Sequence, residues 1–464
     1  MNEDDGVREV PASAGQRLLW LLDHYRGEHG ALNEPLVWRI SGRLSVAGLR
    51  QALDGLTARH EMLRTTFSFQ HRQLVQRIHA PRPLPLVFVD LSDRPDPERA
   101  AADAMDREIA ERIDPADWPI RVRLWRVRKA EHVRVRKAEH VLCVNVHHLV
   151  TDRWSNGTLA ADLATLYNQL ITGEGDLPEI GWQYAEWSEW QRRRFEAGRL
   201  RELQEYWLGK LDGAQLPALP GQKMGSPYTI SIGAYEQRDL GPELSLALRR
   251  VGDQQRATAF PVALAAFYVQ LHALTRQRDQ SVASLFANRL RPEVRHTIGF
   301  FVNMLVLRVR LDPQMRFSEL VRECRSTVIG ALAHQELPYQ MLPPAVVRAE
   351  TDHGVVRADD VVFQFVEGEQ PASARLRLAG ADIAPVEWGL RRRFALELFL
   401  ACNDEGVTML LVYDEARFDG AWASRFVDQY SALLRTATGN PDATVAELLA
   451  GQVVPPRTAP VRGP

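Results

Sequence analysis

The sequence predicts a mixed α/β protein in two parts, and three observations lead to this prediction. First, amphipathic stretches with apolar residues every three or four positions alternate with short apolar stretches along the chain. Second, the chain has 464 residues, a length that holds two or three domains of roughly 100–200 residues. Third, the polar segment 172–178 (TGEGDLP) combines glycine with proline and is the best linker candidate. We therefore expect an N-terminal part over residues 1–176 and a C-terminal part over residues 177–464, ending in a disordered tail rich in proline and arginine.

The individual elements follow from spacing. Leu49, Leu53 and Leu56 are separated by four and three residues, which predicts a helix over residues 46–59. A proline at the start and apolar residues at every fourth position predict another helix over residues 97–113. Further N-terminal helices are expected over residues 13–25 and 155–171, and strands over residues 36–40, 64–69, 73–78 and within 120–148. The C-terminal part is expected to hold helices near residues 183–196, 201–211, 242–250, 261–275, 317–333 and 422–436, and strands near 280–286, 304–309, 361–366, 394–402 and 407–413.

Composition excludes several classes of protein. The chain has 57 basic and 59 acidic residues, so no overall field attracts nucleic acid or an anionic membrane. Its three cysteines, Cys143, Cys324 and Cys402, are too few and too scattered for a disulfide framework or a zinc knuckle. No signal peptide and no stretch of about 18 uninterrupted apolar residues is present. We expect a cytoplasmic protein that contacts neither nucleic acid nor membrane.

Several motifs are absent from the sequence. It has no GxxxxGK[ST] phosphate loop, no GxGxxG after a strand, no GxSxG and no HExxH. Its 13 histidines are dispersed except at His147 and His148, whose neighbours lack tetrahedral ligand spacing. We therefore expect no nucleotide site and no metal site.

An eight-residue segment is duplicated. Residues 126–133 (RVRKAEHV) recur without change as residues 134–141. Because eight is even, a strand through the repeat keeps the alternation of its two faces. The repeat predicts an elongated, exposed hairpin tip, and docking of a partner is the alternative interpretation.

The most informative stretch is residues 140–155 (HVLCVNVHHLVTDRWS). In a strand, His147 and His148 point to opposite faces, so only one of them can face a given cavity. Asp152 lies four residues beyond His148, where it could orient an imidazole or pair with a basic residue and fix the loop. The residue types alone leave a catalytic and a structural interpretation open.

This pattern resembles the HHxxxDG motif of the condensation domains of nonribosomal peptide synthetases, in the chloramphenicol-acetyltransferase-like superfamily. Six further stretches are similar to motifs of that family, in the family's order. They are residues 13–20 (SAGQRLLW), 59–67 (RHEMLRTTF), 182–187 (WQYAEW), 287–291 (ANRLR), 298–303 (IGFFVN) and 334–340 (HQELPYQ). The resemblance implies two chloramphenicol-acetyltransferase-like lobes in a V-shaped pseudo-dimer with a central tunnel.

The resemblance also implies an activity. An acceptor amine, or less often a hydroxyl, attacks an acyl or peptidyl thioester and gives an amide or an ester. The enzyme is expected to bind no dissociable cofactor, since the phosphopantetheine arm arrives on a peptidyl or acyl carrier protein. Carrier proteins are therefore the expected donor and acceptor partners, with a free small-molecule acceptor as an alternative, and a monomer is expected.

Residue roles carry over from the motifs. His148 is the catalytic or amine-positioning histidine, and His147 is a packing residue that shapes the loop. Asp152 makes a structural ion pair, for which Arg289 is the candidate partner. The remaining residues expected to line the tunnel or support the site are Arg153, Trp154, Ser155 and Asn303. For Trp154 a role in packing is the stronger interpretation.

The sequence departs from the family pattern at two places. Arg153 replaces the glycine of HHxxxDG, and it could face solvent, bind a carboxylate-bearing substrate or disable the site. The late motif resembling RDxSRNPLFQ is not recognisable in residues 345–366. Both histidines are kept, unlike in heterocyclization domains, and the further motifs of epimerization domains are not found.

A condensation enzyme is therefore the leading interpretation, and a free-standing one is expected. One alternative is an acyltransferase of the same superfamily that uses a coenzyme A thioester. The other is a non-catalytic condensation-like platform that recruits a partner to a carrier protein.

Overall fold

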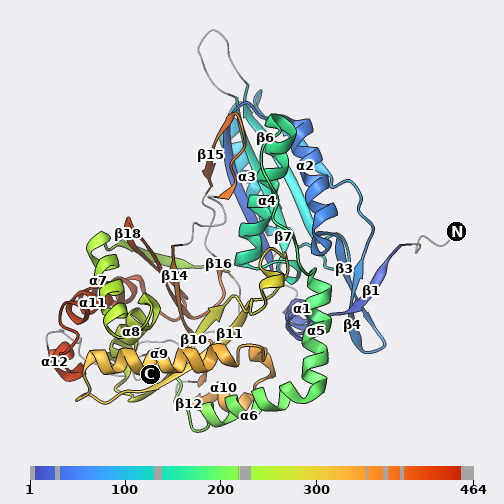
Figure 1. The fold of residues 1–464 in the computed structure, drawn as a ribbon. Coiled ribbons are helices and arrows are strands. Elements are labelled where there is room, and N and C mark those ends of the chain that lie inside the picture. Colours follow the sequence, from blue (N-terminus) through green and yellow to red (C-terminus); the bar gives the residue numbers. More distant parts are fainter. Residues whose placement is uncertain are drawn as a thin grey trace, which may run out of the picture. The chain divides into compact units, whose positions relative to one another are not determined.

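A computed structural model describes residues 6–26, 32–129, 138–217, 219, 231–351, 354–368, 375–386 and 391–450 (Figure 1). Internal contacts divide the chain into two compact units. Unit 1 comprises Met1–Arg199, Ala287–Val302 and Gln370–Trp388, and unit 2 comprises Leu200–Phe286, Asn303–Glu369 and Gly389–Pro464. The units are thus interleaved along the sequence, whereas we expected two contiguous parts that divide at residue 176. Composition indicates a polar connection but not the points where the chain returns to an earlier unit.

Unit 1 contains two sheets. A five-stranded sheet has the order β15-β2-β7-β6-β5, in which only the β5–β6 pair is parallel, and a three-stranded antiparallel sheet has the order β1-β4-β3. The strands are β1 (Arg8–Pro11), β2 (Asn33–Gly42), β3 (Thr65–Gln70), β4 (Gln73–Ile78), β5 (Leu86–Asp90), β6 (Ile120–Arg128), β7 (Glu139–His147) and β15 (Ala381–Pro385). The helices are α1 (Ala14–Arg26), α2 (Val46–Arg59), α3 (Pro97–Ala110), α4 (Arg153–Thr172) and α5 (Tyr184–Arg194), with short 3-10 turns at Glu61–Arg64, His148–Val150 and Pro292–Val294 and a π-turn at Phe195–Arg199.

The central strand β7 is covered on both faces because its residues are apolar on both. On one side, Val141 and Cys143 pack in a core with Met105 of α3. Figure 1 shows α2 and α4 side by side along the sheet. The strand that carries the histidine motif is therefore held in the interior of unit 1.

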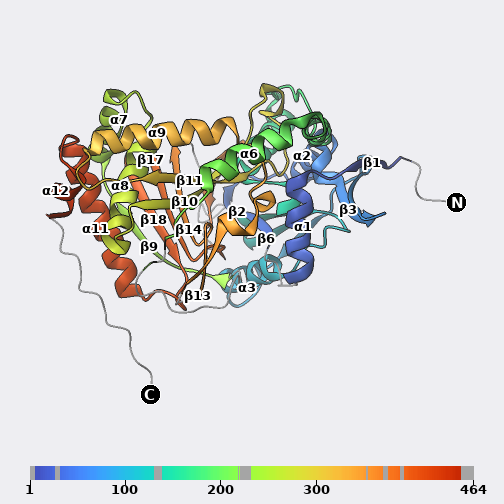
Figure 2. The ribbon, with the colours of Figure 1, turned by 90° about the horizontal axis from the view of Figure 1, so that it is seen from below.

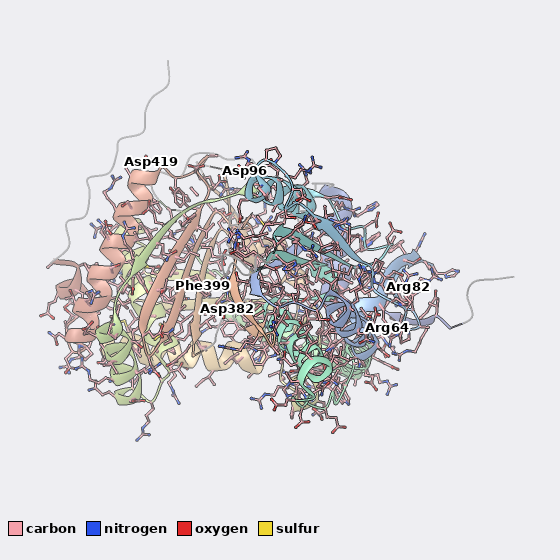
Figure 3. The ribbon with its side chains drawn as sticks, turned by 90° about the horizontal axis from the view of Figure 1, so that it is seen from above. Arg64, Arg82, Asp96, Asp382, Phe399 and Asp419 are labelled. Atoms are coloured by element: carbon pink, nitrogen blue, oxygen red, sulfur yellow. The ribbon has the colours of Figure 1, made fainter. Side chains whose placement is uncertain are left out.

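Helix starts in both units follow the N-cap rule that a short polar side chain accepts a hydrogen bond from a free backbone N–H. Asp96 accepts from Arg99 N at 3.0 Å at the start of α3. Asp419 accepts from Trp422 N at 2.7 Å at the start of α11 (Gly420–Gly439). Figure 3 labels both caps.

Unit 2 is built on a six-stranded mixed sheet with the order β11-β10-β14-β17-β18-β9. Its strands are β9 (Ala234–Asp239), β10 (Asp279–Phe286), β11 (Asn303–Arg310), β14 (Val361–Glu367), β17 (Leu396–Asn403) and β18 (Gly406–Tyr413). The other elements are α6 (Leu200–Leu211), β8 (Ser231–Ile232), α7 (Pro242–Gln254), α8 (Ala259–Thr275), α9 (Phe317–Ala333), a 3-10 turn at Tyr339–Met341, α10 (Pro344–Val347), β12 (Arg348–Thr351), β13 (Gly354–Arg357), β16 (Arg391–Arg392), α11 and α12 (Val445–Ala450). Figure 2 shows α8, α9 and α11 alongside the sheet, and nearly every residue of α8 is buried.

Within the described ranges, no single helix is long and apolar enough to cross a membrane. Only α7 and α8 taken together pass that test, and they are bent by 100° at their junction.

The duplicated segment lies on β6 and β7. The described end of the first copy is on β6, where Arg126 pairs with His140 of the second copy on β7. A register shift follows, and Arg128 then pairs with Glu139. The expected hairpin is therefore present up to this pair, and the predicted tip, residues 130–137, lies outside the described residues.

Candidate active site

The two histidines lie where a strand gives way to a turn. His147 is the last residue of β7, and His148 is the first residue of the following 3-10 turn. The prediction that both lie in one strand is wrong by one residue, because His148 N–H bonds to Leu32 O, before the start of β2, at 2.8 Å and the chain then turns. The two rings nevertheless meet different partners.

The His148 ring is held in one orientation and one tautomer. Its Nδ1 lies 2.8 Å from Thr151 O. Because a carbonyl oxygen can only accept, Nδ1 carries the proton and the neutral ring has its lone pair on Nε2. The ring also meets Phe300 edge to face, with centroids 5.1 Å apart. Burial lowers the pKa of His148, against the opposing effects of the Thr151 hydrogen bond and the Asp152 charge, so the ring is neutral at pH 7.

The His147 ring is a buried structural group. Its Nδ1 accepts a hydrogen bond from Leu149 N at 3.1 Å, which places the proton on Nε2. That nitrogen faces Asp23 of α1 at 3.7 Å, and Asp23 accepts from Arg112 at 2.7 Å. Burial lowers the pKa of His147. These contacts fit the predicted role in shaping the loop.

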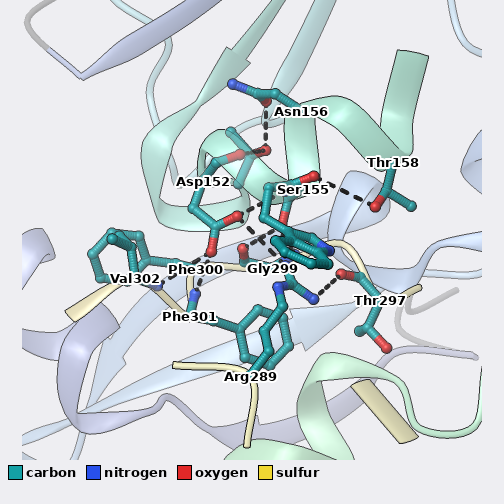
Figure 4. Close-up of polar contacts among 12 residues, drawn as sticks. Asp152, Ser155, Asn156, Thr158, Arg289, Thr297, Gly299, Phe300, Phe301 and Val302 are labelled. Atoms are coloured by element: carbon teal, nitrogen blue, oxygen red, sulfur yellow. Dashed lines mark hydrogen bonds and ion pairs between the residues drawn. The ribbon is translucent and has the colours of Figure 1, made fainter. Parts of the chain in front are cut away.

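Asp152 joins the motif to a segment far along the chain (Figure 4). One carboxylate oxygen caps α4 by accepting from Ser155 N at 2.7 Å. The other accepts from Phe301 N at 3.0 Å and Val302 N at 3.2 Å. Arg289 lies 3.4 Å from the first oxygen, so the predicted ion pair with Arg289 is present in the structure. We call Asp152, Ser155, Arg289 and the backbone at Phe301 and Val302 the clamp.

Arg289 and Ser155 complete the clamp. The Arg289 guanidinium donates to Val294 O at 2.6 Å, to Thr297 O at 2.8 Å and to Ser155 Oγ at 2.7 Å. Ser155 Oγ also donates to Gly299 O at 2.7 Å and accepts from Gly299 N at 3.0 Å. The Asp152 and Arg289 side chains are only 2% and 5% exposed. The clamp therefore pins the stretch Ala287–Val302 against the first turn of α4.

Other stretches singled out in the sequence support the same region. Gln16 donates to Leu149 O at 3.1 Å in the turn that carries His148. Tyr184 donates to Phe300 O at 2.7 Å, and a side chain at Gly299 would place its Cβ 2.0 Å from the Tyr184 ring. His60 bonds Asp162 of α4 at 2.8 Å. Gln16 and Tyr184 thus support the turn and the segment that meet at this site, and His60 bonds α4 further along the helix.

Arg153 and Trp154 begin α4. Arg153 is exposed, and its φ is negative, so the position does not require a glycine backbone. Exposure agrees with the solvent-facing interpretation, and the two other interpretations remain predictions. Trp154 is half-buried and donates from Nε1 to Arg295 O at 3.0 Å, which agrees with a role in packing.

Asn303 lies in unit 2, at the start of β11, and its amide is fully engaged. Its nitrogen donates to Gln335 O at 2.8 Å and Leu337 O at 2.6 Å. Its oxygen accepts from Met304 N at 2.9 Å and Tyr339 N at 3.1 Å. The side chain thus fixes the loop 335–339, and a role in lining a tunnel stays a prediction.

Sequence reasoning missed Glu34 of β2. Its carboxylate lies 3.8 Å from His148 Nδ1. The contact depends on the register of β2 on β7, in which Glu34 pairs with Val146, and no local pattern reveals that register. Across the described residues, no group of three or more His, Cys, Asp or Glu side chains could hold a metal ion.

Comparison with known proteins identifies the family. A family model of the condensation domain matches residues 7–452. This chain belongs to the condensation-domain family. The family's assembly-line proteins include a linear gramicidin synthase protein of Brevibacillus parabrevis, which is 32% identical over 446 residues, 95% of this chain and 8% of that protein. Phosphinothricin tripeptide synthetase PhsC of Streptomyces viridochromogenes is 33% identical over 454 residues, 96% of this chain and 40% of that protein. The chain spans less than half the length of these relatives.

Solved structures confirm the predicted condensation-domain fold. The condensation domain from the monacolin K polyketide synthase MokA matches with a TM-score of 0.76 at 20% identity, over 95% of this chain and all of that chain (100%). The X-domain in its complex with OxyB from teicoplanin biosynthesis matches with a TM-score of 0.76 at 21% identity, over 95% and 96% of the two chains.

Proposed function

We propose that this condensation domain transfers an acyl or peptidyl group from a carrier-protein phosphopantetheine thioester to an acceptor amine or hydroxyl. The observation that carries the proposal is the state of His148: a largely buried, neutral imidazole whose Nδ1 donates a hydrogen bond to Thr151 O. With its lone pair, His148 Nε2 accepts a proton from the acceptor, or aligns the acceptor by hydrogen bonding.

In the transfer step, each bond that forms is matched by a bond that breaks. The acceptor nitrogen or oxygen attacks the thioester carbon, and its proton moves to His148 Nε2. The C–N or C–O bond forms, the C–S bond breaks, and the carrier thiol leaves with the proton from His148. Asp152 holds the loop rather than the substrate, since backbone N–H groups and Arg289 engage both of its oxygens.

Acyl transfer is tested by intact-mass detection, with donor-loaded carrier proteins and either free or carrier-bound acceptors. The His148→Ala variant is expected to lose transfer by a factor of about 10²–10⁴, the usual contribution of a general base. The control is His140→Gln, near the other end of β7, with circular dichroism to confirm that both variants fold. Transfer that survives in His148→Ala contradicts the assigned role.

The same experiment separates the two alternatives. Transfer from coenzyme A thioesters but not from loaded carriers supports the coenzyme A-dependent acyltransferase. Carrier binding without transfer, unchanged in His148→Ala, supports the recruiting platform.

A further inference from the structure

The acid of the HHxxxD motif, Asp152, is not able to move toward the His148 ring during the reaction. Asp152 is four residues away, but its two oxygens accept from Ser155 N, Phe301 N and Val302 N and face Arg289. Its carboxylate is therefore fixed in the clamp. Its charge still favours a protonated His148 ring, from a position that cannot move toward the ring.

A second carboxylate reaches the ring from the neighbouring strand. Glu34 pairs with Val146 in the β2–β7 register, so its side chain lies on the Val146 face of the sheet, and His148 begins the turn two residues after Val146. Glu34 Oε1 is 3.8 Å from His148 Nδ1, and the two side chains are 18% and 12% exposed. The separation is too long for a hydrogen bond and short enough for a charge to act strongly in partial burial.

We propose that Glu34 is a positioning residue for the transfer step, stabilising the His148 imidazolium that forms when Nε2 takes the acceptor's proton. The inference rests on the proposed function. In the resting enzyme the neutral ring is held at Nδ1 by Thr151 O. Once protonated, the ring carries a positive charge next to the Glu34 carboxylate, and the two attract.

Two other carboxylates, Asp23 and Asp152, lie near the histidines of the motif. On the opposite face of the strand, His147 faces Asp23, which is paired with Arg112. At the start of α4, Asp152 is paired with Arg289. Both of these carboxylates are thus compensated by an arginine within unit 1. Changing Glu34 alone therefore alters the charge next to His148 while leaving both pairs intact.

The test compares Glu34→Gln with the wild type in the acyl-transfer assay across pH. Transfer is expected to rise with pH as His148 loses its proton. Because a carboxylate 3.8 Å away favours the protonated imidazole, Glu34→Gln is expected to lower the pKa of His148 and to shift this rise to lower pH. It is also expected to reduce the plateau kcat by about tenfold with little change in KM, because the imidazolium is less stabilised. Glu34→Asp is expected to recover part of the loss, and Glu139→Gln, at the far end of β7, is expected to leave the profile unchanged.

A second measurement keeps this inference separate from the proposed function. The imidazole signal of His148, assigned by its loss in His148→Ala, is titrated by NMR in the wild type and in Glu34→Gln. A lower pKa of His148 in Glu34→Gln supports the inference even if no transfer is detected. An unchanged pKa of His148, or an unchanged pH profile and plateau in an active enzyme, overturns it, while loss of activity in His148→Ala alone still supports the proposed function.

Discussion

In unit 1, the clamp surrounds Asp152 with backbone N–H donors, whereas in unit 2 a pair of aspartates depends on arginine charges. Asp152 accepts from three backbone N–H groups in addition to facing Arg289. Asp360 accepts from one backbone N–H, of Arg357 at 2.9 Å, and from Arg417 at 3.3 Å. Its neighbour Asp359 pairs with Arg357 at 2.9 Å.

The protonation behaviour of the unit 2 pair follows from this difference. Burial raises the pKa of Asp360 against the lowering charge of Arg417, and the neighbouring Asp359 raises it further. Burial raises the pKa of Asp359 in the same way. Backbone N–H dipoles stabilise a buried carboxylate without placing a second negative charge beside it. Two adjacent aspartates, in contrast, repel each other when both are ionised. We expect the clamp to be intolerant of substitution and the unit 2 pair to be tolerant.

The largest expected effect is that of Asp152→Asn. The amide nitrogen would face an N–H donor or Arg289 in any orientation, leaving buried polar groups unpaired. The free energy of unfolding should fall by roughly 3–5 kcal/mol, as for a broken buried ion pair, and acyl transfer should be lost with it. Urea denaturation followed by circular dichroism measures the first effect. A loss below about 1 kcal/mol would show that the clamp is not what holds Ala287–Val302 to α4.

The matched substitution in unit 2, Asp359→Asn, should have a smaller effect that depends on pH. Because the folded-state pKa of Asp359 is raised, its contribution to stability is fully present below the unfolded pKa and is lost as pH rises through the folded value. Asp359→Asn removes this loss, so the stability of the variant relative to the wild type should increase with pH above about 4, by on the order of 1 kcal/mol. Urea midpoints measured between pH 4 and pH 8 test the sign, and a relative stability that falls with pH would refute it.

The smallest expected effect on stability is that of Arg153→Gly, at the exposed first position of α4 beside the clamp. The free energy of unfolding should change by less than about 0.5 kcal/mol. Acyl-transfer rates with neutral and carboxylate-bearing donors or acceptors test the specificity hypothesis for this residue. If every rate and preference stays the same, Arg153 has no part in substrate choice.

The sequence predicted elements with a strong local pattern. The helices expected over residues 46–59 and 317–333 coincide with α2 and α9, and the strand expected over 73–78 coincides with β4. It missed short strands such as β1, β5 and β15, which extend the edges of sheets and lack alternation of their own. Their pairing depends on partners far away in the sequence, as in β15, whose Ile383 pairs with Ile40.

The same distinction between local patterns and long-range pairing applies to the candidate site. The Asp152–Arg289 pair was predicted because both residues lie in recognisable stretches. Glu34 was not, because only the strand register brings it to His148. Asp360 lies in the stretch where the late motif is not recognisable, and it pairs with Arg417, which lies beyond β18. No local pattern in the sequence indicates this pairing.

The duplication on β6 and β7 has a consequence for how this chain can evolve. Excising residues 130–137 would join Lys129 to Ala138 and leave a single RVRKAEHV. Because Arg128 pairs with Glu139, the joined residues would form a two-residue connection, the commonest hairpin length. Unequal recombination could thus add or remove one repeat unit while the paired residues of β6 and β7 keep their partners. The hairpin is a position where descendants of this chain can differ in length without moving the strand that ends at His147.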